Sequence, residues 1–325
     1  MRKIVFQIIK ILLGFTLLFL SIRSVDWSIF QQALQSAKSV WLLAALLSVL
    51  LSVSLKIIRW RILLKNFQVK LHWMRLITAY FLGQAANILF VFRTGEIVRI
   101  GWAHQPDQQD LVEFTSSIAI EKYMDLLMFV VSMLVVSTAL PDIVLKDVAI
   151  YQIAAITASL LLILVILVGP WIWQKFFANQ IRSNWYEKIA ARLDGFIKAS
   201  LWLRKPAKVS PVILLSICIW LIMGLTNGLL FASLGLSLHW QAAGLVMILV
   251  YFGVLPALMP GNIGPFTYFA QLALLPFSVE ASTALAFAVI LYVMVNLPML
   301  LIAGILLLIP KINSQRMHNT NNTRS

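Results

Sequence analysis

Long apolar runs restrict what this chain can fold into more than any other feature of its sequence. Runs that approach or exceed the roughly 20 residues of a membrane-spanning helix occupy six stretches: 4–22, 40–58, 114–140, 148–172, 211–235 and 281–309. Only 12% of the 325 residues are charged, against about 25% in a soluble domain. Because lipid cannot satisfy backbone polar groups, such runs cross a membrane as helices. The sequence therefore predicts an all-α polytopic membrane protein.

Loop charge predicts how these segments are oriented, because Lys and Arg are enriched in cytoplasmic loops. Segment 59–75 holds five basic residues and no acid, while 173–210 and the tail 311–325 are also strongly basic. By contrast, 141–147 has two Asp residues against one Lys. We expect 141–147 to lie outside the cell, the basic segments and both termini to lie in the cytoplasm, and the protein to reside in the inner (plasma) membrane.

These orientations leave two interrupted apolar regions, 76–100 and 241–277, that must each return to the side from which they enter. We expect two re-entrant helical hairpins together with about six full spans, giving eight membrane segments in all. The single membrane domain, 1–310, then consists of two half-repeats of inverted topology, 1–142 and 147–310, which is an architecture of transporters. Eight ordinary spans, with a weaker charge bias in one loop, are the alternative.

The net charge of +14 would suggest nucleic acid in a soluble protein. Here the bias of cytoplasmic loops explains it more simply, and we expect a membrane partner and no nucleic acid. The single cysteine, Cys218, excludes an intrachain disulfide, and the four histidines lack metal-ligand spacing. We therefore expect neither a metal nor a cofactor. Segment 173–210 is either a helix on the inner surface or a short soluble helical hairpin.

The stretch "NILFVFRTGEIVRI" places charges directly after an apolar segment. Thr94 or Gly95 can end one hairpin arm and start the next, which puts Glu96 in the first turn of the returning arm. Arg93 and the free amides at that helix start suit a phosphate, and Arg99 can pair with Glu96 one turn away. The cluster is thus either a phosphate site, to which Asn87 also belongs, or a structural Arg–Glu clasp.

A second charged stretch, "SSIAIEKYMDLLMFV", puts two acids on one face of a predicted span. Glu121 and Asp125 are one turn apart, and Lys122 can reach Asp125. The pair either faces a substrate site, where it carries protons or balances the arginines, or belongs to a ring of interfacial charges.

A third stretch, "LPALMPGNIGPFTYF", has two Pro/Gly pairs on either side of Asn262. Pro suits the first turn of a helix, so we expect a new arm to start at Pro265. Pro260, Gly261 and Gly264 would then break the segment and let Asn262 and freed backbone groups face a headgroup. The alternative is a simple kink.

The chain resembles a flippase-like membrane family related to the transmembrane region of lysylphosphatidylglycerol synthases. The resemblance rests on "RWRILL", "GQAANILFVFRTGEIVRI", "AIEKYMDLL" and "LPALMPGNIGPF". The positions that match the family pattern are Asn87, Arg93, Gly95, Glu96, Arg99, Glu121, Asp125, Pro260, Gly261 and Gly264. Four positions depart from it: Val91 replaces a Pro, Lys122 an Arg, Asn262 a Gly, and Thr267 a Glu. The missing acid at Thr267 weakens a coupling or headgroup role there.

The residues and the resemblance together predict a protein that moves an anionic phospholipid or a polyisoprenyl-type lipid phosphate between leaflets, without enzymatic activity. Arg93 and Arg99 would bind the phosphate, and Glu96, Glu121 and Asp125 would tune the binding site or carry protons. Residues 260–265 would form the opposing half-site. Two alternatives remain: a membrane-embedded lipid-phosphate transferase, and a non-transporting partner of a lipid-modifying or glycosyl-transfer enzyme.

Overall fold

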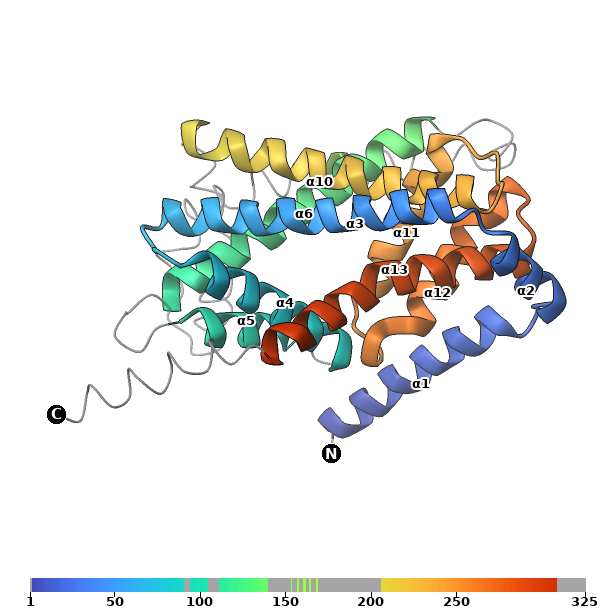
Figure 1. Cartoon of the computed structure of the whole chain (residues 1–325), viewed down its shortest axis with the longest axis horizontal. Helices are drawn as coiled ribbons and strands as arrows, with labels where there is room; N and C mark the ends of the chain where they lie inside the picture. The colour runs from blue at the N-terminus through green and yellow to red at the C-terminus, as the bar shows by residue number, and fades with distance from the viewer. Residues whose placement is uncertain are drawn as a thin grey trace.

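A computed structural model describes residues 2–90, 94–104, 111–139 and 206–308, together with six isolated helical positions between 153 and 168. All the regular structure in these residues is helical, so the all-α prediction is confirmed (Figure 1). The α-helices are α1 (Arg2–Ile22), α2 (Trp27–Ser36), α3 (Ser39–Asn66), α4 (Trp73–Leu89), α5 (Gly95–Ala103), α6 (Leu111–Ala139), α10 (Pro206–Ser233), α11 (Trp240–Val254), α12 (Ile263–Leu274) and α13 (Ala281–Leu308). Two 3₁₀ turns, η1 (Pro260–Asn262) and η2 (Leu275–Phe277), flank α12.

Three helices within the described part of the chain are long and apolar enough to cross a membrane: Ser39–Asn66, Val209–Ser233 and Ala281–Leu308. They match three of the predicted spans. The predicted loop 141–147, segment 173–205 and the tail 311–325 lie outside the described residues, as does most of the run 148–172. The count of eight segments, the orientation in the membrane and the re-entrant character of the hairpins stay predictions.

Helix α3 continues further than the charge pattern indicated. We expected the basic segment 59–75 to be a cytoplasmic loop, but α3 runs to Asn66. Arg59 and Trp60 are both fully buried, and the Asp125 carboxylate of α6, 2.8 Å from the Arg59 guanidinium, compensates the buried charge. A buried cation with a partner does not end a helix, so the apolar run and the start of the basic segment form one element.

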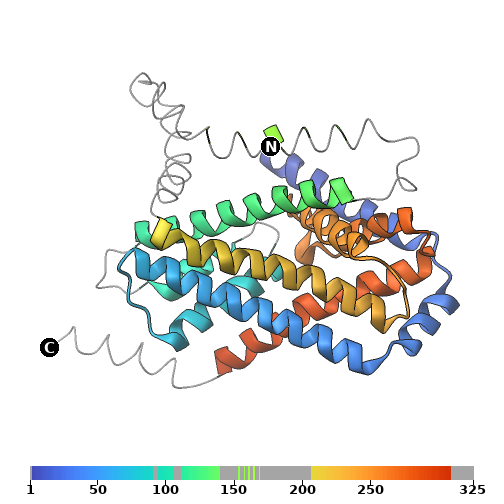
Figure 2. The same ribbon diagram turned by 90° about the horizontal axis from the view of Figure 1, so that it is seen from above.

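Helices α3 and α10 run antiparallel along the length of the molecule and lie side by side in both views (Figures 1 and 2). Small hydroxyl side chains join them: Ser48 Oγ lies 2.8 Å from Thr226 Oγ1, and Arg59 Nη1 donates to Ser216 Oγ over 2.9 Å. Small and polar residues are the usual contacts between helices in a membrane, where apolar burial supplies little attraction. This pair forms one wall of the interior.

The two predicted hairpins lie toward opposite ends of the molecule, α4 with α5 at one end and α11 with α12 at the other (Figures 1 and 2). Arms α4 and α5 pack closely because both carry glycine at the contact. A Cβ on Gly83 would lie 2.8 Å from the Gly95 carbonyl oxygen, and one on Gly95 would collide with the Gly83 carbonyl. The helix start predicted at Thr94 or Gly95 is confirmed, with Glu96 in the first turn.

The break in the second hairpin occurs where the Pro/Gly pairs indicated. Gly261 and Asn262 have φ values of 66° and 49°, in the left-handed region. Helix α12 nevertheless begins at Ile263 and not at Pro265. Pro265 lies in the first turn, where its missing N–H costs no hydrogen bond. The tip at Gly261 faces the Ile88 carbonyl at the end of α4, so the tips of the two hairpins meet.

Candidate functional site

Arg99, which the sequence assigned to a phosphate, pairs with a carboxylate and lies against two aromatic rings. Its Nη1 and Nη2 donate to the two carboxylate oxygens of Glu121 over 3.1 and 2.8 Å. The guanidinium carbon also lies 3.7 Å from the centre of the Trp60 ring and 4.9 Å from that of Tyr80. Both members of the ion pair are buried. The expected pairing of Arg99 with Glu96 is therefore wrong, because α6 brings a better-placed acid to the same side chain.

Two further ion pairs differ from those expected within single helices. Lys122 pairs with Glu96 of α5 over 3.1 Å, and Asp125 pairs with Arg59 of α3 over 2.8 Å. The expected contact of Lys122 with Asp125 is thus not formed. We call the six residues Arg59, Glu96, Arg99, Glu121, Lys122 and Asp125 the ion-pair cluster. It ties α3, α5 and α6 together, and each of its acids has its own cation.

Asn87 has a structural role at the start of α5. Its Oδ1 accepts a hydrogen bond from the Gly95 amide over 2.9 Å. This amide is one of those that the sequence offered to a phosphate, and here a side chain of α4 satisfies it. Arg93 lies outside the described residues, so its predicted phosphate contact stays a prediction.

The broken segment at 260–264 is also held by internal contacts. Asn262 Oδ1 accepts from the Met259 amide over 3.4 Å, and Pro260 is exposed. Gly264 lies against the backbone of α1, where a Cβ would be 2.9 Å from the Leu18 nitrogen. Thr267, where the family has Glu, is buried and donates to the Ile263 carbonyl over 2.8 Å. The Thr that replaces the Glu of the resembled family pattern thus places a hydrogen-bonded hydroxyl at a buried position.

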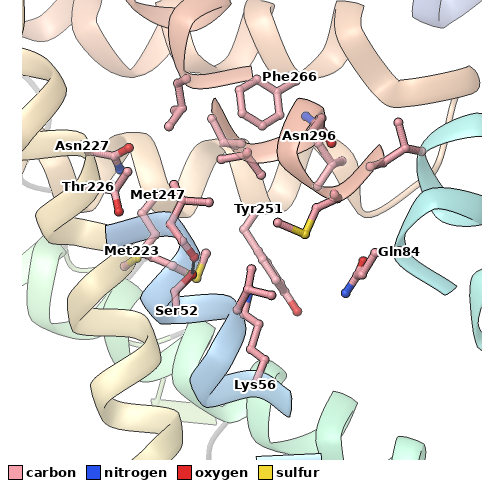
Figure 3. A pocket seen from close by; sticks show the side chains of 18 of the residues that line it. Ser52, Lys56, Gln84, Met223, Thr226, Asn227, Met247, Tyr251, Phe266 and Asn296 are labelled. Atoms are coloured by element: carbon pink, nitrogen blue, oxygen red, sulfur yellow. Dashed lines mark hydrogen bonds between the residues drawn. The ribbon is translucent and has the colours of Figure 1, made fainter. Parts of the chain in front are cut away.

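A cavity of about 230 Å³ lies among α3, α4, α10, α11, α12 and α13, and most of its lining is apolar (Figure 3). It therefore joins helices from both predicted halves of the chain. None of the nine predicted site residues that the structure describes lines it. The sequence motifs mark the helix ends and the ion-pair cluster beside the cavity. Of the residues in the quoted stretches, only Gln84, Ile88 and Phe266 line the cavity, and our reading of the sequence assigned none of these three a role.

Lys56 of α3 is the basic residue of this lining, at the opposite end of the view from Phe266 and Asn296 (Figure 3). Within the described part of the chain its ammonium makes no hydrogen bond, and no carboxylate lies within 4.0 Å. Our reading of the sequence missed Lys56. The available signal was a lysine inside the apolar run 40–58, because ionisable residues within spans usually mark functional positions.

Neutral polar groups complete the lining. Gln84 Nε2 donates to the Tyr80 hydroxyl over 3.1 Å, Asn227 Nδ2 to the Ala243 carbonyl over 2.9 Å, and Asn296 Nδ2 to the Tyr292 carbonyl over 2.8 Å. A primary amide has two N–H groups, so each of the three side chains keeps one donor. The cavity therefore combines apolar walls, one cation and several neutral donors.

The family model described as the lysylphosphatidylglycerol synthase TM region matches residues 7–304. The match covers all the helices described above except the ends of α1 and α13. No curated protein matches the chain.

Proposed function

Because the chain belongs to the family of the lysylphosphatidylglycerol synthase TM region, a family of membrane proteins, we propose that it moves an anionic lipid between the leaflets of a membrane. The lipid would be an anionic phospholipid or a polyisoprenyl-type lipid phosphate. The observation that carries the proposal is the cavity between the predicted halves, with Lys56 in its mostly apolar wall.

The dimensions of the cavity suit part of a lipid. Its volume of about 230 Å³ lies just below the roughly 300–1,000 Å³ of pockets that enclose drug-sized ligands. A headgroup with the first part of its chains fits, and the remaining chain length stays in the bilayer. The apolar walls of α11 and α13 offer the contact that such chains need, and the neutral donors suit phosphate and glycerol oxygens.

The surrounding structure supports movement of a bound lipid between two faces. The hairpins come from opposite ends and their tips meet beside the cavity wall at Ile88. In transporters with inverted repeats, broken helices of this kind flank the substrate near the midplane. We assign Arg93 to the first contact with the headgroup at one tip. The segment from Pro260 to Gly264 provides the opposing half-site at the other.

The proposal is tested with purified protein in liposomes that contain tail-labelled fluorescent lipids. A membrane-impermeant quencher added outside reports how fast the label of the inner leaflet becomes accessible. We expect faster exchange of a phosphatidylglycerol probe than in protein-free liposomes, and little exchange of a phosphatidylcholine probe. Val250→Trp, which fills the cavity, should abolish the exchange, whereas Val40→Trp, at a position 77% exposed on α3, should leave it intact. Protein-free rates for every anionic probe would exclude this function.

The same liposomes address the transferase alternative. A new lipid species that forms only with the protein and a lipid-phosphate donor, detected by mass spectrometry, would support the transferase and not the transporter.

A further inference from the structure

Among the residues that the structure describes, the charges that act on Lys56 leave it without a counter-ion. Asp125 and Glu121 attract its ammonium, while Arg59 and Lys122 repel it. Both acids are already committed, Asp125 to Arg59 over 2.8 Å and Glu121 to Arg99 over 2.8 Å. The third acid of the ion-pair cluster, Glu96, holds Lys122. Four basic side chains thus face three carboxylates, and the unmatched positive charge is the one in the cavity wall.

An ammonium without a partner is unfavourable at this position. Lys56 belongs to a predicted span, only half-buried, and its neighbours in the lining include Val53, Met223 and Met247. Taking a charge out of water is costly unless an opposite charge or hydrogen bonds compensate. Lysine in a span normally faces the protein interior or a wet cavity and marks a ligand path. An anion entering the cavity would supply the missing compensation.

We propose that Lys56 is the anion-binding residue of the cavity, and that its ligand is an amphiphile with a phosphate-type anionic group at its polar end. This assignment rests on the proposed function and identifies the residue that would recognise the transported lipid. The anionic group lies against the Lys56 ammonium, Gln84 donates its free N–H group to a neighbouring oxygen of the polar end, and the chain lies along the apolar wall.

The choice of lysine suits a ligand that must enter and leave. The guanidinium groups of Arg59 and Arg99 are fixed on carboxylates, whereas an ammonium is a compact charge on a flexible stem that accepts many ligand orientations. The arginines therefore hold the helices together beside the cavity, and Lys56, one helical turn from Arg59, stays available for the ligand.

The test compares full-length wild-type protein with Lys56→Met, Lys56→Arg and a control, Lys65→Gln, which removes an exposed charge from the same helix. Binding of short-chain phosphatidylglycerol, phosphatidylcholine and inorganic phosphate is measured in a neutral detergent. We expect Lys56→Met to weaken phosphatidylglycerol binding about tenfold to a hundredfold, the loss of one charge-assisted hydrogen bond. Lys56→Arg should keep binding within a few fold, and Lys65→Gln should bind normally.

The thermal unfolding midpoint separates a ligand role from a structural one. Without lipid, Lys56→Met should melt at or above the wild-type temperature, because it removes an unpaired charge. With saturating phosphatidylglycerol, only proteins that bind it should gain a higher midpoint. A Lys56→Met protein that melts lower than wild type and still binds phosphatidylglycerol normally would overturn the assignment. If Lys56→Met cannot be purified, phosphatidylglycerol binding by Lys56→Gln that equals the wild type would overturn it as well.

The ligand arms and the transport assay keep the two proposals distinct. Inorganic phosphate that displaces phosphatidylglycerol at similar concentrations would overturn the amphiphile part and indicate a site for the free ion. Lys56-dependent lipid binding without any transport by the wild type would exclude the proposed function and leave the binding assignment standing. If transport and binding are both unchanged in Lys56→Met, the assignment of Lys56 as the anion-binding residue is excluded, and the proposed transport function still stands.

Discussion

The ion-pair cluster and the cavity lie side by side and treat their charges in opposite ways. In the cluster, Arg59 and Arg99 each lie 2.8 Å from a carboxylate of α6. In the cavity, Lys56 has no such partner among the described residues. The sequence motifs draw attention to the cluster, yet each of its acids pairs with one of its cations. The comparison teaches that a charged residue within a span is better assigned to a ligand when it lacks an ion-pair partner than when it belongs to a sequence motif.

The largest effect is expected when one member of the buried pair Arg99–Glu121 is removed, which tests whether the charges of the cluster are committed to one another. Arg99→Ala should lower the free energy of unfolding by about 3–5 kcal/mol, because it leaves an uncompensated carboxylate in the interior. Thermal and chemical unfolding in detergent measure this loss. The double variant Arg99→Met/Glu121→Leu should recover most of the lost stability, since removing both partners leaves no uncompensated charge in the interior. A single variant as stable as the wild type would mean that the pair is open and that Arg99 is free for a ligand.

A second prediction concerns the glycine contact that lets α5 carry Arg99 to α6. Gly83→Ala should cost about 1–3 kcal/mol of stability, because the added methyl meets the Gly95 carbonyl at 2.8 Å and forces the arms apart. Gly101→Ala is the matched control on α5, as nothing lies within 4 Å of its Cβ position. It should be neutral or slightly stabilising, since Ala favours a helix. Equal melting temperatures for the two variants would show that the arms tolerate separation.

The smallest effect is expected far from both regions, at Asp26, which caps α2. The Ser28 hydroxyl and the amides of Ser28 and Ile29 donate to its carboxylate and hold its pKa below the ordinary value of 3.8. Because the pKa of Asp26 is lower in the folded state, the stabilisation by its charged carboxylate is fully present above the unfolded-state pKa. It is lost as the pH falls through the folded-state pKa. Asp26→Ala should therefore slightly lower the melting temperature at pH 7 and have no effect at a pH below both values. A constant difference across that range would contradict the cap.

The local features of the hairpins could be predicted from the sequence because they depend on neighbouring residues. Gly95 starts a helix with Glu96 in its first turn, and Gly261 and Asn262 break the chain by adopting positive φ. Such positions follow from backbone chemistry alone. The all-helical class followed in the same way, from the length of the apolar runs.

The pairing of charges could not be predicted, because rules for one helix consider only partners on that helix. Glu96 and Arg99 are well spaced to meet, and so are Lys122 and Asp125, but packing of α5 and α3 onto α6 offers each a closer partner. The cavity was missed for the same reason. Its lining takes residues from six helices, and no stretch of sequence contains more than a few of them.

Tyr80 belongs to both regions. Its side chain lines the cavity and is only 1% exposed, and the centre of its ring lies 4.9 Å from the Arg99 guanidinium carbon. One aromatic side chain thus contacts both the cavity proposed to take a headgroup and the cluster of six charges. A smaller side chain would connect the two and let water reach charges that could pass protons along.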